Sequence, residues 1–341
     1  MTKTTILLGA IAALASATTR PALAAGTSLN GSGSTLSKPY QEVAIEEFKK
    51  ANKGVTLNYG GGGSGKGRQD LADMVVDFAG SDAPYKEADL AKVKGGEVLY
   101  FPILLGPITV SYNVDGVDKL NLSPATLAKI SQRDVKKWND PAIAADNAGV
   151  KLPDADIVVA HRADGSGTTQ NFTEFLNTAA KGVWKLKSGS TVEWPSDTQA
   201  GQGNGGVAQI VKSTKGAIGY VDLSDAKASG LKYASIKNQA GTFVEPTPEA
   251  ASAAGEGIEV KPNLLFSALN AKGPKSYPIT CQTWVIVYAK QTDHAKGTAL
   301  KSYLRYLVSD GQKQLKDIDY APLPKSLSES SVKQIEKIQV P

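Results

Sequence analysis

The chain reads Arg162-Ala163-Asp164-Gly165-Ser166-Gly167-Thr168-Thr169 at the point where one hydrophobic pattern gives way to another. Before this stretch, residues 157–160 (Ile-Val-Val-Ala) form a short apolar run typical of a buried strand. After it, Phe172, Phe175 and Leu176 recur at helical spacing. The stretch therefore predicts a strand-to-helix turn, which is where α/β proteins bind ligands.

The residues of this turn suit an anion. A helix start offers unpaired N–H groups and the positive end of the helix dipole, and both favour an oxyanion. Arg162 adds a planar, two-pronged donor. Asp164 would repel an anion that it faced, so we expect it to pair with Arg162 and fix its orientation. Taken alone, the motif is equally consistent with a surface loop that carries a fortuitous ion pair.

The tripeptide Gly-Ser-Gly occurs three times, at 31–33, 63–65 and 165–167, and each copy precedes a helical pattern. Because glycine has no side chain, its N–H group can approach a ligand closely. Each single copy is consistent with an ordinary turn. Together the three copies predict a site that surrounds one compact oxyanion, with nearby hydroxyl groups as donors. These hydroxyls belong to Ser34, Thr35, Ser64, Ser166 and Thr168.

Asp82 follows a strand-like segment in Gly80-Ser81-Asp82-Ala83-Pro84. One interpretation is a helix cap or turn former. The other is that Asp82 faces the anion, in which case the anion must carry a proton. Phosphate keeps one or two protons near neutral pH, whereas sulfate is fully ionised and would meet repulsion and an unpaired acceptor. Asp82 therefore predicts a preference for phosphate over sulfate.

Helical and strand-like patterns alternate along the chain, which favours an α/β architecture. Residues 100–110 are apolar and rich in strand formers but contain Pro102 and Gly106-Pro107. Such interruptions predict a crossover between two lobes rather than one straight strand. Helices are predicted at 39–51, 67–76, 169–179, 207–211 and 294–315, and strands at 55–59, 76–80, 157–160 and 217–221.

Residues 1–25 have the features of an export signal that is removed: Lys3, an apolar run at 6–15, and the small-x-small site Ala22-Leu23-Ala24. The apolar run is too short to span a bilayer. Without Lys3 and Arg20, 36 of the 38 basic residues remain against 33 acidic ones, a formal charge of +3. Because these charges are scattered, nucleic-acid binding is not expected.

Cys281 is the only cysteine, so no intramolecular disulfide can form. It lies in a strand-like run and is expected to be a small buried apolar residue. His161 and His294 are the only histidines. One cysteine and two histidines are too few for a transition-metal cluster, and neither a metal nor another cofactor is predicted.

Across nearly the whole mature chain, the ordered motifs resemble those of the periplasmic phosphate-binding proteins of bacterial ABC phosphate importers. The motifs that carry this resemblance are Gly31-Ser32-Gly33-Ser34-Thr35, Gly63-Ser64, residues 76–84 (Val-Asp-Phe-Ala-Gly-Ser-Asp-Ala-Pro), residues 162–168, residues 216–221 (Gly-Ala-Ile-Gly-Tyr-Val) and Asp319-Tyr320-Ala321.

The resemblance implies a two-lobed periplasmic-binding-protein fold, type II-like, in which each lobe is a mixed sheet flanked by helices and the ligand lies in the cleft between them. Lobe I would comprise residues 26–105 and 278–341, and lobe II residues 106–277. Leu36 would contribute its backbone N–H in place of an aromatic residue common there, and Asp164 would support Arg162. By matching positions, the phosphate ligands would be Thr35, Leu36, Ser64, Asp82, Arg162, Ser166, Gly167 and Thr168.

The function that the resemblance implies is that of a periplasmic receptor, a monomer and not an enzyme. It would capture inorganic phosphate and deliver it to the membrane permease subunits of an ABC transporter. Contacts from both lobes exist together only when the cleft is shut, so phosphate would shift the population toward the closed form.

Parts of the sequence are also consistent with three other functions. A secreted phosphate-ester hydrolase could use the same pocket, but Asp164 occupies the first glycine position of a Gly-x-Ser-x-Gly elbow around Ser166. Arsenate has protonation similar to that of phosphate and stays open as a ligand. Residues 60–66 fit the start of a nucleotide-binding P-loop, but Gly67 stands where Ser or Thr would hold Mg²⁺.

Overall fold

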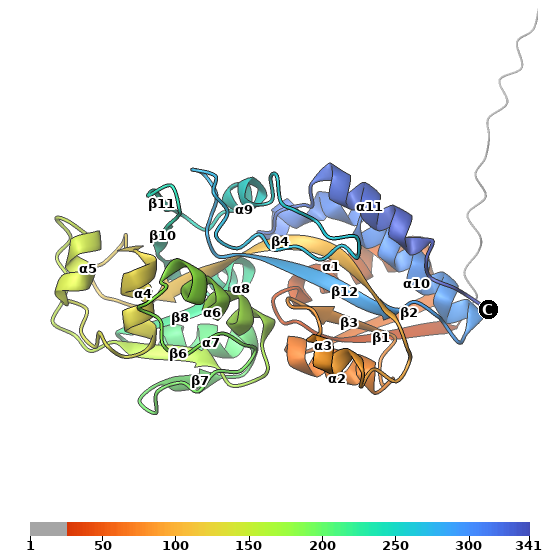
Figure 1. The fold of residues 1–341 in the computed structure, drawn as a ribbon, viewed down its shortest axis with the longest axis horizontal. Coiled ribbons are helices and arrows are strands. Elements are labelled where there is room, and N and C mark those ends of the chain that lie inside the picture. Colours follow the sequence, from red (N-terminus) through yellow and green to blue (C-terminus); the bar gives the residue numbers. More distant parts are fainter. Residues whose placement is uncertain (1–25) are drawn as a thin grey trace, which may run out of the picture.

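The computed structural model describes residues 26–341, so the predicted signal peptide (1–25) lies outside the described residues. The described chain forms two α/β lobes, and the long strand β4 (Val98–Tyr112) runs through both of them (Figure 1). The expected fold class, two lobes that each hold a mixed sheet flanked by helices, is confirmed.

The first lobe contains both ends of the described chain. Strand β1 (Thr27–Gly33) lies between β2 (Val55–Gly62) and β3 (Phe78–Ser81), and all three are parallel. Strand β12 (Thr280–Tyr288) returns from the second lobe and pairs antiparallel with β3 and β4, which makes the sheet mixed. The helices of this lobe are α1 (Lys38–Ala51), α2 (Ser64–Ala72), α3 (Glu87–Leu90), α10 (His294–Leu307), the 3₁₀ segment η1 (Asp310–Ile318) and α11 (Lys325–Ile335).

The second lobe is built on the other half of β4. Strand β8 (Ala217–Asp222) pairs antiparallel with β4, and β6 (Val158–Arg162) and β7 (Gln199–Gly201) continue the sheet in parallel. Its helices are α4 (Pro124–Ser131), α5 (Pro141–Asp146), α6 (Gly167–Ala179), α7 (Gly203–Ser213) and α8 (Leu223–Ala228). Short strands complete it: β5 (Asn121–Leu122), β9 (Lys232–Tyr233), β10 (Ser235–Lys237) and β11 (Phe243–Val244). Helix α9 (Pro248–Ala254) packs against first-lobe residues, because its Ala251 lies in the buried cluster that contains Leu105 and Leu323.

The sequence predicted an interruption in β4, but the strand is continuous over 15 residues. What changes at Pro107 is its partner: β4 pairs with β12 up to Pro107 and with β8 from Ile108 onward. Pro102 is accommodated because the ladder with β12 shifts register between Thr283 and Trp284, directly opposite it. A bulge of this kind removes the need for the N–H group that proline lacks.

The limits of helix α2 differ from the prediction. The helix begins at Ser64 rather than Gly67, and it ends at Ala72 rather than continuing to residue 76. Met74 has a φ of 62°, a left-handed conformation that no helix continues through. Met74 and Val75, which share one face with Leu71 in the predicted helix, lie beyond its end and are 54% and 68% exposed.

The single helix predicted at 294–315 is divided in the structure: α10 ends at Leu307, and the 3₁₀ segment η1 follows from Asp310. The apolar residues of this pattern, Leu300, Leu304, Leu307 and Leu315, are all buried. Cys281 is fully buried in β12, and burial raises the pKa of its thiol well above the usual value. Across residues 26–341, no helix has the length and apolar character needed to cross a membrane.

Candidate anion-binding site

The predicted site residues come from two separate regions of the chain and lie close together. Ser64 begins α2 and Asp82 follows β3 in the first lobe, while Gly167 begins α6 in the second. A Cβ atom placed on Gly167 would lie 2.4 Å from Ser64 Oγ and 2.7 Å from Asp82 Oδ2. The two Gly-Ser-Gly turns also touch, because Gly65 N–H donates to the Gly165 carbonyl over 2.8 Å. The described form is thus one in which the lobes meet at the site.

Arg162 ends strand β6, and the expected pairing with Asp164 is present. Nε donates to Asp164 Oδ1 over 2.8 Å, and Nη2 donates to Oδ2. Burial alone would raise the pKa of Asp164, but the hydrogen bonds and charge of Arg162 hold it below its usual value. Asp164 Oδ1 also accepts from Gly203 N–H at 3.0 Å. The carboxylate is therefore ionised and fixes the plane of the guanidinium.

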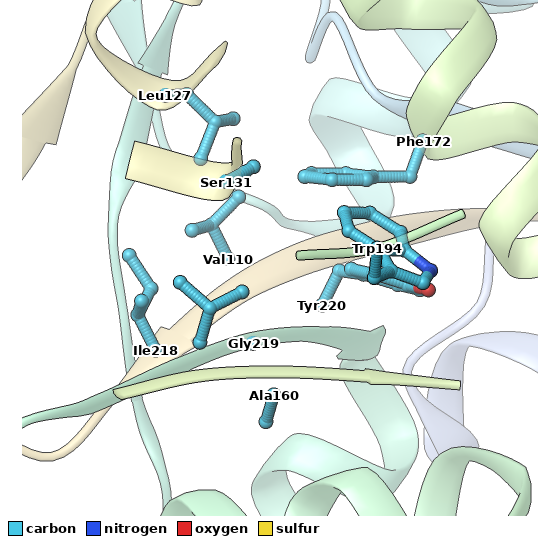
Figure 2. Close-up of a pocket in the computed structure, with 10 residues that line it drawn as sticks. Val110, Leu127, Ser131, Ala160, Phe172, Trp194, Ile218, Gly219 and Tyr220 are labelled. Carbon is cyan, nitrogen blue, oxygen red and sulfur yellow. The ribbon is translucent and has the colours of Figure 1, made fainter. Parts of the chain in front are cut away.

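An aromatic stack supports Arg162 from the second lobe. Arg162 N–H donates to the Tyr220 hydroxyl over 3.1 Å, and the Tyr220 ring stacks on Phe172 with centroids 4.4 Å apart. Figure 2 shows these two rings with Trp194 beside an apolar hollow lined by residues such as Val110 and Leu127. No charged side chain lines this hollow, so it is not suited to an anion. Its aromatic rings instead belong to the stack that supports Arg162.

Asp82 is buried and surrounded by hydroxyl groups. Ser34 Oγ and Thr283 Oγ1 donate to Oδ1 over 2.6 and 2.7 Å, and Ser64 Oγ donates to Oδ2 over 3.2 Å. An ionised carboxylate has about four acceptor positions. These contacts fill three, and the remaining one belongs to Oδ2, the oxygen that lies against Gly167. Asp82 can therefore accept one more proton donor on the side of the second lobe.

Burial raises the pKa of Asp82, and the hydroxyls of Ser34, Thr283 and Ser64 oppose that rise. The raised pKa expresses the cost of keeping a carboxylate away from water. A ligand that brings its own proton relieves this cost, because its O–H group donates to Oδ2. A fully ionised ligand would place negative charge beside an unpaired acceptor.

The N-terminus of α6 provides donors from the second lobe. Ser166 caps the helix, since its Oγ accepts from Thr169 N–H over 3.0 Å, and its own hydroxyl hydrogen remains free to donate. Thr168 Oγ1 accepts from Arg162 Nη1 over 3.3 Å. Ser166 and Thr168 are both fully buried. A helix start with an arginine beside it favours an oxyanion.

Thr35 and Leu36 occupy the loop between β1 and α1. Thr35 Oγ1 accepts from Asn204 N–H of α7 over 3.2 Å, a contact that joins the two lobes. Leu36 is fully buried, and its carbonyl accepts from the Tyr320 hydroxyl over 2.6 Å. Tyr320 belongs to the predicted motif 319–321, whose Ala321 pairs with Leu105 of β4. The motif thus anchors the Leu36 loop to the strand that joins the lobes.

Three residues at the site were not predicted from the sequence: Asn171, Asn204 and Thr283. Ser34, which directly follows the first Gly-Ser-Gly copy, was predicted as a hydroxyl donor, and its hydroxyl donates to Asp82 Oδ1. Asn171 Nδ2 donates to the Asp82 carbonyl over 2.7 Å, and Thr283 reaches Asp82 from β12. These two approach Asp82 from 89 and 201 positions away in the chain, which no local pattern reveals.

The histidines take part in other contacts. The His161 ring stacks on Trp194 with centroids 5.0 Å apart and contacts Thr198 Oγ1 and the Arg162 carbonyl, each at 3.0 Å. His294 Nδ1 lies 2.6 Å from the Pro341 carbonyl. Among residues 26–341, no three His, Cys, Asp or Glu side chains are grouped so that they could hold a metal ion.

The fold and site define a class of protein. Residues 16–311 match the family described as "PBP superfamily domain". The phosphate-bound structure of a high-affinity periplasmic phosphate-binding protein (PfluDING) has a TM-score of 0.74 at 21% identity, covering 89% of this chain and 92% of that one. The phosphate-binding protein from Stenotrophomonas maltophilia has a TM-score of 0.71 at 19% identity, covering 90% and 93%. The chain thus has the two-lobed fold of periplasmic binding proteins.

Curated relatives identify the family more narrowly. "Phosphate-binding protein PstS" of Xylella fastidiosa (strain Temecula1 / ATCC 700964) is 34% identical over 314 residues, which cover 90% of this chain and 84% of the relative. "Phosphate-binding protein PstS 3" of Mycobacterium leprae is 37% identical over 309 residues, covering 87% and 83%. The Pasteurella multocida PstS is 33% identical over 345 residues, covering 99% and 95%. The chain belongs to the PstS family of phosphate-binding proteins.

Proposed function

We propose that this protein binds inorganic phosphate in the periplasm and delivers it to an ABC-type import permease. Its membership of the PstS family supports this function. The observation that carries the proposal is that one site combines groups that attract negative charge with an acceptor that needs a proton on the ligand. Arg162 and the start of α6 attract any oxyanion, whereas Asp82 Oδ2 accepts a further bond only from a ligand that carries a proton.

The proposed ligands are the eight residues expected from the sequence. Arg162, Ser166, Gly167 and Thr168 would bind from the second lobe, and the other four from the first. The hydroxyl of Ser166 supports this assignment, because it accepts from Thr169 and so keeps its hydrogen for the anion. The full set is Thr35, Leu36, Ser64, Asp82, Arg162, Ser166, Gly167 and Thr168, with Asp164 in support of Arg162.

The mechanism that we propose is hinge closure between lobe I (26–105 and 278–341) and lobe II (106–277). The change of partner along β4, between Pro107 and Ile108, supports the first boundary. The start of β12 at Thr280 supports the second. Two connections would then bend when the lobes separate, β4 and the segment that leads into β12, and phosphate would stabilise the closed form because it contacts both lobes. The permease would recognise the closed protein as the loaded one.

Catalysis is not part of the proposal. A phosphate-ester hydrolase would need an activated nucleophile or a metal cluster. Ser166 Oγ is the N-cap of α6, and the two histidines contact Thr198, Arg162 and Pro341 instead of Ser166. We therefore expect the mature protein to leave an aryl phosphate ester uncleaved while it binds free phosphate.

The test is calorimetric titration of the mature protein with phosphate, sulfate and arsenate at pH 7. We expect tight binding of phosphate and binding of sulfate that is at least about 100-fold weaker, since leaving a buried charged acceptor unpaired costs roughly 3 kcal/mol. Titration with arsenate measures the alternative that its similar protonation leaves open. Silence toward phosphate, or equal affinity for sulfate, would refute the proposal.

A further inference from the structure

Asn204 is the second residue of helix α7 and is fully buried against the site. Its side chain contacts three of the proposed phosphate ligands. Oδ1 lies 3.5 Å from Arg162 Nη1, and Nδ2 lies 3.3 Å from Thr35 Oγ1 and 3.5 Å from Thr168 Oγ1. Thr35 belongs to the first lobe and the other two ligands to the second, so one amide group connects both halves of the site.

The contact with Arg162 fixes which way the amide points. A guanidinium group only donates hydrogen bonds, so the atom that faces Arg162 Nη1 must be the acceptor Oδ1. The donor Nδ2 then faces the two threonines, and it has one hydrogen for each of them. The orientation therefore follows from hydrogen-bond chemistry alone.

This orientation determines the direction of both threonine hydroxyls. Thr35 Oγ1 accepts from Asn204 N–H at 3.2 Å as well as from Nδ2, and these two bonds occupy both lone pairs of the oxygen. Thr168 Oγ1 accepts from Arg162 Nη1 at 3.3 Å and from Asn204 Nδ2. With both oxygens acting as acceptors, each hydroxyl hydrogen is left to donate elsewhere.

We propose that Asn204 is a positioning residue that turns the hydroxyls of Thr35 and Thr168 into donors toward the bound anion and links the two lobes in the closed form. This inference rests on the proposed phosphate-binding function. It assigns the start of α7 a role beside the start of α6: α7 orients the hydroxyls that would bind, while α6 supplies donors directly. Gly203 permits this close approach, because its φ of 66° suits glycine and a Cβ there would lie 3.3 Å from Thr35 Cγ2.

The first test compares Asn204→Ala with Gln209→Ala, an exposed position on the same helix. We expect Asn204→Ala to weaken calorimetric binding of inorganic phosphate by about 10- to 100-fold, the loss of one or two well-oriented bonds to a charged group. Gln209→Ala should bind within about twofold of the wild type. If Asn204→Ala fails to fold, Asn204→Ser replaces it, because a serine hydroxyl cannot serve both threonines at once.

The second test separates orientation of the hydroxyls from a merely structural contribution. Thr35→Val removes one oriented hydroxyl, so in the double variant Asn204→Ala/Thr35→Val the loss of affinity should be clearly smaller than the product of the two single losses. Independent, multiplicative losses would overturn the inference, as would wild-type affinity in Asn204→Ala. A wild-type protein that does not bind phosphate would instead refute the proposed function itself, and the inference with it.

Discussion

A Cβ atom on Gly167 would lie 2.6 Å from the Cβ of Asp82, closer than two such carbons can approach. Gly167 begins α6 in the second lobe, and Asp82 follows β3 in the first. Glycine at this position is therefore required by contact across the cleft, since its φ is not among the positive values found elsewhere in the chain. The requirement applies only while the lobes are together.

Gly167→Ala should consequently prevent closure without harming the fold. We expect phosphate affinity to fall by at least about 100-fold. The added methyl group either keeps the lobes apart or forces the closed form to distort, and overpacking of this kind costs roughly 3 kcal/mol. Thermal unfolding of the unliganded protein should change little. Calorimetry and differential scanning calorimetry measure the two effects.

The matched control is Gly205→Ala in α7, where a Cβ meets nothing within 4 Å. Alanine there should raise the stability by up to about 1 kcal/mol, since it favours the helix, and leave binding unchanged. A Gly167→Ala protein that binds phosphate as tightly as this control would contradict the closed arrangement of the site.

Asp82→Asn tests the choice of anion. The amide keeps the size of the carboxylate but removes the negative charge and can itself donate. We expect the ratio of phosphate to sulfate affinity to fall by at least about tenfold, chiefly because sulfate gains. Competition calorimetry measures the ratio. Asp70→Asn, in the same lobe and bonded to Ser32 and Lys66, is the control and should preserve it.

Lowering the pH should act on the wild type in the same direction as this substitution. Because burial raises the pKa of Asp82, the side chain takes up a proton at a higher pH than an ordinary aspartate does. The affinity for sulfate should therefore rise relative to that for phosphate as the pH falls through the raised pKa of Asp82. In Asp82→Asn, the ratio of the two affinities should change less with pH. A wild-type ratio that is constant down to pH 4 would contradict the role given to Asp82.

The sequence predicted much of this site because its strongest signals are local. The pairing of Arg162 with Asp164 follows from two charges two residues apart at a strand end, and the structure contains that ion pair. The turns at Ser64 and Ser166 were visible as Gly-Ser-Gly before helical patterns. Ion pairs and turns of this kind form between residues that are close in the sequence, so the sequence alone is enough to predict them.

What the sequence could not predict is the contact between distant elements. Thr283 and Asn204 have no local feature that marks them, and their roles arise only when β12 and α7 pack beside the site. The same holds for the end of α2, where apolar Met74 and Val75 continue the helical pattern although the backbone has already turned. A hydrophobic pattern gives a helix face, but a single left-handed residue ends the helix.

Arg162→Lys should weaken phosphate and sulfate together. Lysine keeps the charge but loses the planar donor pair that binds both oxygens of Asp164, and its ammonium cannot reach Thr168 and Asp164 at once. We expect at least about a 30-fold loss for each anion, as for a disrupted buried charge pair. Arg133→Lys, at a partly buried arginine that pairs with Asp197, is the control and should leave both affinities unchanged. Selective loss of one anion would contradict the general role of Arg162.

Asp164→Asn should lower the free energy of unfolding by about 3 kcal/mol at pH 7, because it leaves the buried Arg162 without its counterion. Arg162 holds the pKa of Asp164 below the ordinary 3.8 in spite of burial. For a carboxylate whose pKa is lowered by folding, the stabilisation is present above the unfolded value and is lost as the pH falls through the folded value.

The stability difference between the wild type and Asp164→Asn should therefore be constant from pH 7 to about pH 5 and shrink below pH 3.8. Urea unfolding of the unliganded proteins at several pH values measures it. Asp197→Asn is the control: its carboxylate pairs with Arg133 but is half-exposed and screened by water, so the substitution should change the stability little at every pH. A difference for Asp164→Asn that persists undiminished at pH 3 would mean that Asp164 stabilises the fold by its shape and not by its charge.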